Sequence, residues 1–482
     1  MKSTIFPDGG TLLSISKLTL NNFRCFEQCS IELHPKLTVI VAENAQGKTA
    51  LLDAISIAID VFVTAIASGG KSHGFDRDSV HLSRKGGSKM EPSLPTEFYA
   101  EGFANGCKVK WSRSLTKYDV RGRSSKKDMK ELIDAADQLR SRAINFSPSA
   151  ADLPPTLPIV AFYGTGRLWS EHRLTEGKKV PNPTGLSRFS AYLDCLSSSS
   201  SFKSFAVWYE DAFNELRNPT SRLLSSEDRI ENQIAAVEEA VRTVLKPTGW
   251  TSIGWEFLPN RGDGRAPIGG CVVVEHPTHG RIPLSLLSDG VRNIVALVAD
   301  LAYRCVRLNS HLGEAAARLT PGVVLIDEID MHLHPRWQQL VVELLQQAFP
   351  AMQMILTTHS PQVLSTVDAE SIRLIRLDNG NGTTRAPRFQ TRGVESADIL
   401  ARLMDVDPVP QVEQACWLSD YRAMVQVGEH ESETGHGLWS KIVGHFGEEH
   451  PALVEIDTLR RLQAFKHAHR IPHQPVSDHA QD

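Results

Sequence analysis

Residues 42–49 (AENAQGKT) lie between an apolar run and a helical pattern, and they include the residue types that bind phosphate. A phosphate loop needs inward backbone N–H groups, a lysine that reaches the β- and γ-phosphates, and a hydroxyl for Mg²⁺. Lys48 and Thr49 supply these side chains, and the N-terminus of the following helix adds its positive dipole end. The sequence therefore predicts a nucleotide phosphate site, whose other loop residues are Asn44, Ala45, Gln46, Gly47 and Ala50.

Two alanines depart from the strictest glycine pattern of phosphate loops. Ala42 stands where the first glycine is usual, and Ala45 stands where a second glycine is common. An alanine at a backbone position with positive φ costs on the order of 1 kcal/mol, so binding should survive while the loop loses flexibility. We therefore expect slow turnover, which suits a nucleotide sensor better than a motor.

An apolar strand at 322–330 (GVVLIDEID) ends in two neighbouring carboxylates. Asp327 could bind Mg²⁺, and Glu328 beside it could act as the general base that polarises an attacking water. The alternative is a strand that ends in a solvated acidic turn. This segment alone does not separate the two interpretations.

Two further segments place polar groups at the ends of predicted elements. Ser288, Asp289 and Gly290 open a helical pattern, where a small hydroxyl residue and a glycine let a phosphate approach the helix start. The same residues would also suit a simple N-cap. His359 ends an apolar strand in 355–364 (ILTTHSPQVL), where a lone histidine is structural more often than catalytic. Taken singly, neither segment decides a function.

The elements that must position these groups follow from alternation and from apolar runs. We expect strand, turn, strand and strand over 12–42, and a helix over 48–67. Residues 68–95 are predicted as a loop, because they are rich in glycine, serine and charge. A hairpin should turn at Asn105-Gly106, and a helix should cover 126–142.

The second half of the chain predicts helices first and strands afterwards. Two helical patterns, 202–216 and 227–245, precede three strands (WTSIGWEFLP, GCVVVEHP and RIPLSLLS). A strand, a helix (PRWQQLVVELLQQAF) and a strand (MQMILTTH) then indicate a parallel sheet, so the fold class is α/β. The expected bounds are 1–185 and 256–390 for the two parts of the α/β domain, 186–255 for a helical insertion and 391–482 for a helical C-terminal extension.

The bulk composition excludes several classes of protein. A net charge of −4 gives no overall attraction to nucleic acid, and seven scattered cysteines argue for a reducing compartment without disulfides. The apolar run from 51 to 68 contains Asp53 and Asp60, so we expect a buried helix rather than a membrane span. Because the N-terminus lacks the apolar core of a signal peptide, we predict a cytoplasmic protein without membrane contact.

One local stretch could nevertheless contact DNA. Residues 108–130 hold nine lysines and arginines against two aspartates, with Trp111 and Tyr118 interleaved. Basic and aromatic side chains together suit the DNA backbone, whereas a solvated charged surface is the alternative. We keep DNA contact through 108–130 as a hypothesis that predicts a steep salt dependence.

The order of the motifs decides between these alternatives. NNFRCFEQ, AENAQGKTALLDAI, LSDGVRN, LIDEIDMHLHPRWQ and TTHSPQVL resemble, in this order, the RecF/SMC-like branch of the ABC ATPases. The resemblance implies an ABC-ATPase head, a mixed sheet with an antiparallel lobe, that binds ATP and Mg²⁺ between two subunits. The implied roles are phosphate binding for Lys48, Mg²⁺ binding for Thr49 and Asp327, general base for Glu328, contact with the γ-phosphate for His359, contact with the ATP of the opposite subunit for Ser288, Asp289 and Gly290, and approach to the nucleotide for Arg24.

Further segments look like the PtuA ATPases of Septu antiphage defence systems and their relatives in some retron systems. LPIVAFYGTGRLW, DMHLHPRWQ and TRGVESADILARLMDVD are the segments with this likeness, which runs from about residue 12 to about residue 466. It implies a homodimer or a larger homo-oligomer. It also implies a separate HNH nuclease as a partner, whose cutting depends on the ATP state.

Three other functions stay open on the sequence. A DNA-repair ATPase of RecF type would share the motifs, while the NNFR start, the LSDG segment and the helical insertion count against a transporter subunit. A non-hydrolysing scaffold that binds ATP to hold an oligomer would tolerate the loop alanines. Such a scaffold would have no use for Glu328.

Overall fold

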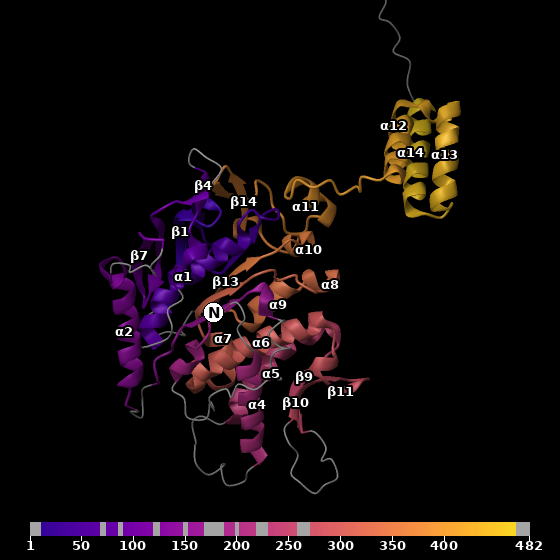
Figure 1. Cartoon of the computed structure of the whole chain (residues 1–482). Helices are drawn as coiled ribbons and strands as arrows, with labels where there is room; N and C mark the ends of the chain where they lie inside the picture. Colours follow the sequence, from indigo (N-terminus) through magenta and orange to yellow (C-terminus); the bar gives the residue numbers. More distant parts are fainter. Residues whose placement is uncertain are drawn as a thin grey trace, which may run out of the picture. The chain divides into compact units, whose positions relative to one another are not determined.

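The structure is a computed structural model that describes residues 11–67, 74–84, 90–118, 126–147, 153–167, 188–197, 202–217, 230–257 and 270–468 (Figure 1). The chain divides into two compact units, Met1–Ile399 and Leu400–Asp482. The finer domain bounds expected from the sequence stay predictions.

A ten-stranded mixed sheet runs through the first unit, in the order β7-β6-β1-β2-β15-β14-β3-β13-β12-β8. The strands from β14 to β8 pair in parallel, and β7, β6, β1 and β2 form an antiparallel lobe. The predicted α/β class, with a mixed sheet and an antiparallel lobe, is confirmed. The bounds are β1 Leu13–Phe23, β2 Phe26–Glu32, β3 Leu37–Val41, β6 Thr96–Ala104, β7 Cys107–Leu115, β8 Ile159–Tyr163, β12 Gly322–Ile326, β13 Met352–Thr357, β14 Ile372–Asp378 and β15 Asn381–Arg385.

Burial explains the continuous apolar runs of the parallel strands. Every residue of β3, β8, β12 and β13 is buried, whereas β6 alternates buried positions with more exposed ones. A parallel sheet is covered on both faces, so its strands need no polar positions. Parallel strands also end at one edge, and three motifs follow β3, β12 and β13 there.

The predicted hairpin is confirmed by β6 and β7, which Asn105 and Gly106 join. Both turn residues have positive φ, 48° for Asn105 and 81° for Gly106. A two-residue turn of this kind matches the right-handed twist of its strands, and Asn-Gly adopts it at low cost.

Helices α1 (Lys48–Ala67) and α6 (Asp289–Leu308) begin at two of the predicted motifs. By length and composition α1 could cross a membrane, but 78% of its apolar window is buried inside the protein, as in a core helix.

The helices predicted from the sequence are present at α1, α2, α4 and α5. The remaining helices are α2 Lys130–Ile144, α4 Phe202–Arg217, α5 Ile230–Leu245, α7 Ala316–Leu319, α8 Pro335–Gln338, α9 Val341–Ala348, α10 Pro361–Leu364 and α11 Ser396–Arg402.

The prediction of a loop over 68–95 is wrong in part. β4 (Leu82–Arg84) and β5 (Met90–Pro92) form a small antiparallel sheet, and Val80 makes a bridge to Phe23. These strands are three residues long and mostly exposed, so they leave no alternating apolar pattern in the sequence. Residues 68–73 and 85–89 of the predicted loop lie outside the described part of the chain.

Two other elements differ from the prediction: one strand is shorter, and one helix is divided in two. β9 (Ser252–Phe257), β10 (Gly270–His276) and β11 (Gly280–Pro283) form a three-stranded sheet, but β11 ends at its proline and a 3₁₀ turn follows. Proline has no N–H with which to continue a ladder. The helix predicted over PRWQQLVVELLQQAF is divided into α8 and α9, and Gln338 at the division donates its side-chain amide to the carbonyl of Leu333 at 2.9 Å.

In the described part of the second unit, the end of α11 is followed by helices α12 (Glu413–Val427), α13 (Glu433–Phe446) and α14 (Pro451–Ala468). The predicted helical character of this part of the chain is confirmed. Its small core is formed by Tyr421, Val425, Ile442, Leu453 and Ile456.

Candidate functional site

The phosphate loop lies between β3 and α1, and its lysine is held in place by the loop itself. Lys48 is 7% exposed, and its Nζ donates to the carbonyls of Ala42 at 2.7 Å and Glu43 at 2.8 Å. Burial lowers the pKa of the Lys48 amine, while the carboxylates at the end of β12 oppose that shift. The amine therefore lies in the loop next to negative charge, which suits a group that reaches phosphates.

The two alanines of the loop differ in backbone conformation. Ala45 has a φ of 63°, in the left-handed region that favours glycine, whereas Ala42 is not among the residues with positive φ. The strain expected of an alanine therefore applies to Ala45 and not to Ala42.

Close packing holds the loop against two other elements. Gly47 has a φ of 88°, and a Cβ there would lie 2.4 Å from the ring of Phe26 and 2.7 Å from Sγ of Cys25. The side-chain oxygen of Gln46 accepts from the backbone N–H of Leu377 in β14 at 2.8 Å. The β1–β2 turn and β14 thus both fix the position of the loop.

The carboxylate at the end of β12 meets the start of α1. Asp327 is 1% exposed, and its Oδ2 accepts from Oγ1 of Thr49 at 2.9 Å. Its Oδ1 accepts from Oγ1 of Thr357, the last residue of β13, at 2.5 Å. The fold therefore brings the hydroxyl of the phosphate loop and the strand-end carboxylate together.

Glu328 directly follows Asp327, and His359 lies two residues after Thr357; both are partly exposed. Glu328 has a φ of 47°, and its backbone N–H donates to Oγ1 of Thr357 at 2.8 Å. The neighbouring Thr358 donates to Oδ1 of Asp330 at 2.5 Å. Two successive threonines thus connect the end of β13 to the segment after β12.

Arg24 lies in the turn between β1 and β2 and forms an ion pair with Asp53 of α1. Its φ is 48°, and its backbone N–H donates to the carbonyl of Ser79 at 3.0 Å. Its Nε is buried and has no hydrogen-bond partner within the described ranges. The neighbouring Cys25 packs on the phosphate loop, so Arg24 lies close to the loop as well.

The Ser-Asp-Gly turn lies at the start of α6. Ser288 is the N-cap residue, yet its side chain makes no capping hydrogen bond, and Asp289 pairs with Arg292 at 2.5 Å. A Cβ at Gly290 would lie 2.4 Å from the carbonyl of His332, in the segment after β12. Among the residues that the structure describes, no hydrogen bond joins this turn to the phosphate loop of the same chain.

The basic stretch 108–130 needs a correction. Trp111 is 4% exposed and donates its Nε1–H to the carbonyl of Ala58 at 2.9 Å, and Arg113 pairs with Asp60 at 3.7 Å. Both side chains pack on α1, because β7 turns them inward, so they are not available to DNA. Lys108 and Lys110 are exposed and pair with Glu101. Residues 119–125 and the side chains of Lys126 and Lys127 lie outside the described part.

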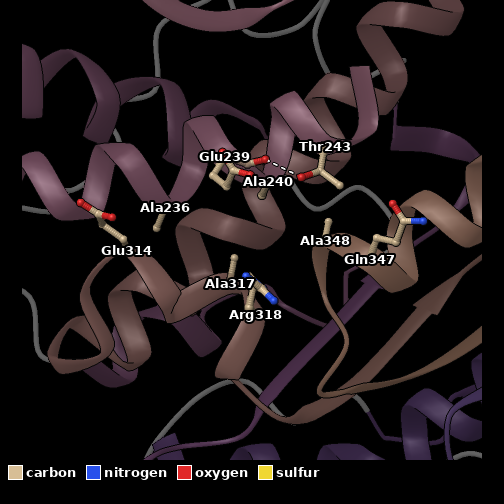
Figure 2. Close-up of a pocket in the computed structure, with 9 residues that line it drawn as sticks. All are labelled: Ala236, Glu239, Ala240, Thr243, Glu314, Ala317, Arg318, Gln347 and Ala348. Carbon is tan, nitrogen blue, oxygen red and sulfur yellow. Dashed lines mark hydrogen bonds between the residues drawn. The ribbon is translucent and has the colours of Figure 1, made fainter. Parts of the chain in front are cut away.

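A separate pocket of about 220 Å³ opens between α5, α7 and α9 (Figure 2). Alanines from all three helices line it, and in Figure 2 Glu239 and Thr243 of α5 lie on one side with Arg318 of α7 on the other. None of its lining residues belongs to a predicted nucleotide motif. The pocket is therefore not the expected ATP site.

Comparisons with known proteins show what this chain is similar to. A family model described as "AAA domain" matches residues 17–246, and one described as "AAA domain, putative AbiEii toxin, Type IV TA system" matches residues 202–365. The solved SmcHead bound to the C-winged helix domain of ScpA is 15% identical, covers 78% of this chain and 98% of its own, and has a TM-score of 0.44.

Two relatives are informative by name. The "Retron Ec83 probable ATPase" of Escherichia coli is 25% identical over 93% of this chain and 86% of its own. The "Septu protein PtuA" of Bacillus mycoides (strain KBAB4) is 46% identical over 17% of this chain and 11% of its own. The chain is similar to retron and Septu PtuA ATPases, and AAA-domain models match parts of it. The resemblance to these ATPases that the sequence motifs predicted is confirmed.

Several contacts at this sheet edge escape sequence reasoning. Thr357 contacts both Asp327 and Glu328, Asp53 pairs with Arg24, and Leu377 binds Gln46, all across long sequence separations. The single available signal was the pair of threonines in TTHSPQVL, at the end of an apolar strand.

Proposed function

We propose that this chain is the ATP-hydrolysing regulatory subunit of an antiphage defence complex. The observation that supports it most directly is the 2.9 Å contact between Thr49 and Asp327, which lie 278 residues apart in the sequence. The Mg²⁺ of bound ATP is typically held by a hydroxyl at the end of the phosphate loop and by a carboxylate that follows a neighbouring strand. The names of the retron and Septu relatives support the defence context.

The residues at this sheet edge fit ATP with Mg²⁺. No cluster of three metal-binding side chains occurs among the described residues, but Mg²⁺ keeps several waters and needs only one or two protein ligands. Thr49 and Asp327 would be those ligands, and Lys48 would bind the phosphates. ATP supplies the phosphoryl group, and Mg²⁺ offsets its negative charge.

The chemistry of hydrolysis is assigned to the groups beside this pair. Glu328 would act as the general base that takes a proton from the attacking water, and His359 would contact the γ-phosphate. Arg24 would approach the nucleotide from the β1–β2 turn. Ala45, with a φ of 63°, supports slow turnover, because an alanine leaves the loop fewer backbone conformations to exchange between than a glycine would.

A second copy of the chain would complete the site. The Ser288 side chain is exposed and does not cap α6, so its hydroxyl is available to another molecule. We assign Ser288, Asp289 and Gly290 to the ATP of the opposite subunit, so that ATP binding drives dimerisation. The dimer would in turn control an HNH nuclease. Among the described side chains of 108–130, exposed lysines such as Lys117 would be available to contact DNA.

The ATPase assignment is tested by steady-state turnover of the wild type and of Lys48→Ala. The matched control is Lys441→Ala, which removes an exposed lysine of α13. Turnover that is lost in Lys48→Ala and kept in Lys441→Ala supports the proposal. ATP binding without any turnover in the wild type would favour the non-hydrolysing scaffold instead.

The partner is tested by affinity purification of the chain from its native locus, followed by mass spectrometry. An HNH-type nuclease at stoichiometric level supports the defence complex. Recovery of replication and recombination proteins in its place would favour a RecF-like repair ATPase.

A further inference from the structure

Thr357, the last residue of β13, is fully buried beside the two strand-end carboxyl residues. Its Oγ1 donates to Oδ1 of Asp327 at 2.5 Å and accepts from the N–H of Glu328 at 2.8 Å. A hydroxyl has one proton, an ionised carboxylate only accepts and an amide only donates, so the direction of both bonds is determined. The carbonyl of Thr357 also accepts from the N–H of Ile329 at 3.0 Å. One residue therefore binds three successive residues after β12.

For Asp327 this means that hydroxyls from two elements hold its carboxylate. Thr49 of α1 binds Oδ2, and Thr357 of β13 binds Oδ1. Thr49 belongs to the proposed Mg²⁺ site, so its hydroxyl has a second use there. Thr357 is not a proposed ligand of Mg²⁺. Its hydroxyl can therefore keep orienting the Asp327 carboxylate while the Thr49 hydroxyl binds Mg²⁺.

Thr357 contacts Glu328 through the backbone of Glu328. A φ of 47° is uncommon in a residue with a Cβ, and such a conformation persists where neighbouring groups hold it. Thr357 binds the amides on both sides of this residue, Glu328 N with its hydroxyl and Ile329 N with its carbonyl. The direction in which the Glu328 side chain leaves the chain therefore depends on Thr357.

We infer that Thr357 is a positioning residue that sets the Asp327 carboxylate and the Glu328 backbone with one hydroxyl; this inference rests on the proposed ATPase function. The role is specific to this residue, because the neighbouring threonine hydroxyl has other partners. The hydroxyl of the next residue, Thr358, instead donates to Asp330 and accepts from the N–H of Ser360 at 2.9 Å. It contacts neither Asp327 nor Glu328.

The test compares three variants of the full chain. Thr357→Val keeps the shape and removes the hydroxyl, and Thr357→Ser keeps the hydroxyl. Thr320→Val is the matched control, because Thr320 is also fully buried, binds Asn309 at 3.0 Å and lies before the opposite end of β12. Partners of metal ligands typically contribute about 10- to 100-fold to activity or metal affinity. We expect a loss of this size in kcat for Thr357→Val, recovery in Thr357→Ser and no such loss in Thr320→Val.

A second readout does not depend on turnover. ATP affinity is measured by calorimetry with Mg²⁺ and with EDTA for the same variants. Thr357→Val should keep the affinity seen in EDTA, because Lys48 and the phosphate loop are unchanged. The same variant should lose most of the increase in ATP affinity that Mg²⁺ causes, because Thr357 no longer orients the Asp327 carboxylate.

The outcomes test the ATPase proposal and the positioning role of Thr357 separately. A wild type without turnover contradicts the ATPase proposal, and the Mg²⁺-dependent gain in ATP affinity then decides the role of Thr357. An active wild type with full activity and full Mg²⁺ gain in Thr357→Val overturns the positioning role alone. Equal losses of activity in Thr357→Val and Thr320→Val, or no recovery in Thr357→Ser, would show that the substitutions act through general stability. Either result would also overturn the positioning role of Thr357.

Discussion

The sheet edge with the phosphate loop and the three-helix unit at the C-terminus bury different kinds of group. At the sheet edge Asp327, Thr357 and Thr358 are at most 1% exposed, and each is hydrogen-bonded. The C-terminal core is instead almost entirely apolar. A buried polar group needs partners of defined geometry, whereas apolar burial is non-directional and supplies stability. Changes at the sheet edge should therefore act on function, and changes in the helical unit should act on folding.

The largest effect should follow from Glu328→Gln at the sheet edge. The change keeps the size of the side chain and the backbone bond to Thr357, but it removes the proposed base. Loss of a general base typically costs about 10²- to 10⁴-fold in rate, so turnover should fall by that factor while ATP still binds. Turnover assays and ATP binding measure the two effects separately. Unchanged turnover would exclude Glu328 as the base.

Ile456→Ala should have the next largest effect, on folding rather than on function. Ile456 is fully buried in the small core of the helical unit, and such a truncation costs about 2–5 kcal/mol. Calorimetry should show a lower melting transition for this unit, with ATP turnover unchanged. The matched control is Val454→Ala, because Val454 is 59% exposed on the same helix. Loss of turnover in Ile456→Ala would contradict the division of roles between the units.

Gly290→Ala should have a moderate effect that combines both kinds of change. The new Cβ would lie 2.4 Å from the carbonyl of His332, so α6 and the segment after β12 must move apart. Overpacking of this kind costs about 1–3 kcal/mol. We expect a lower melting temperature and slower turnover with ATP affinity retained. Wild-type turnover in a protein of lowered stability would show that this contact has a structural role only.

The smallest effect should come from the same substitution at Gly437 and Gly444 in α13. Nothing lies within 4 Å of a Cβ at either position, and both are inside a helix. Alanine should therefore stabilise the helical unit by about 0.5–1 kcal/mol at each site. Opposite signs for glycine-to-alanine changes in the two regions, measured by thermal unfolding, would sharpen the comparison. Destabilisation at Gly437 would contradict it.

The sequence predicted the elements of the sheet edge better than the contacts within it. β3, β12 and β13 are fully buried, so they appear as continuous apolar runs, and α1 has the predicted bounds. The basic stretch was misjudged at Trp111 and Arg113, because residue type does not tell whether α1 covers a side chain. The short β4–β5 pair was missed because exposed three-residue strands carry no periodic signal.

By itself the sequence determined the motifs, their order, the α/β class and the residue types at Lys48, Thr49 and Asp327. These features are local, since they depend on residue type and on spacing within a few residues. Only the tertiary structure decided which hydroxyl meets which carboxylate, as in the contacts of Asp327 with Thr49 and Thr357 at sequence separations of 278 and 30. Such contacts depend on strand order and register, which are properties of the whole sheet.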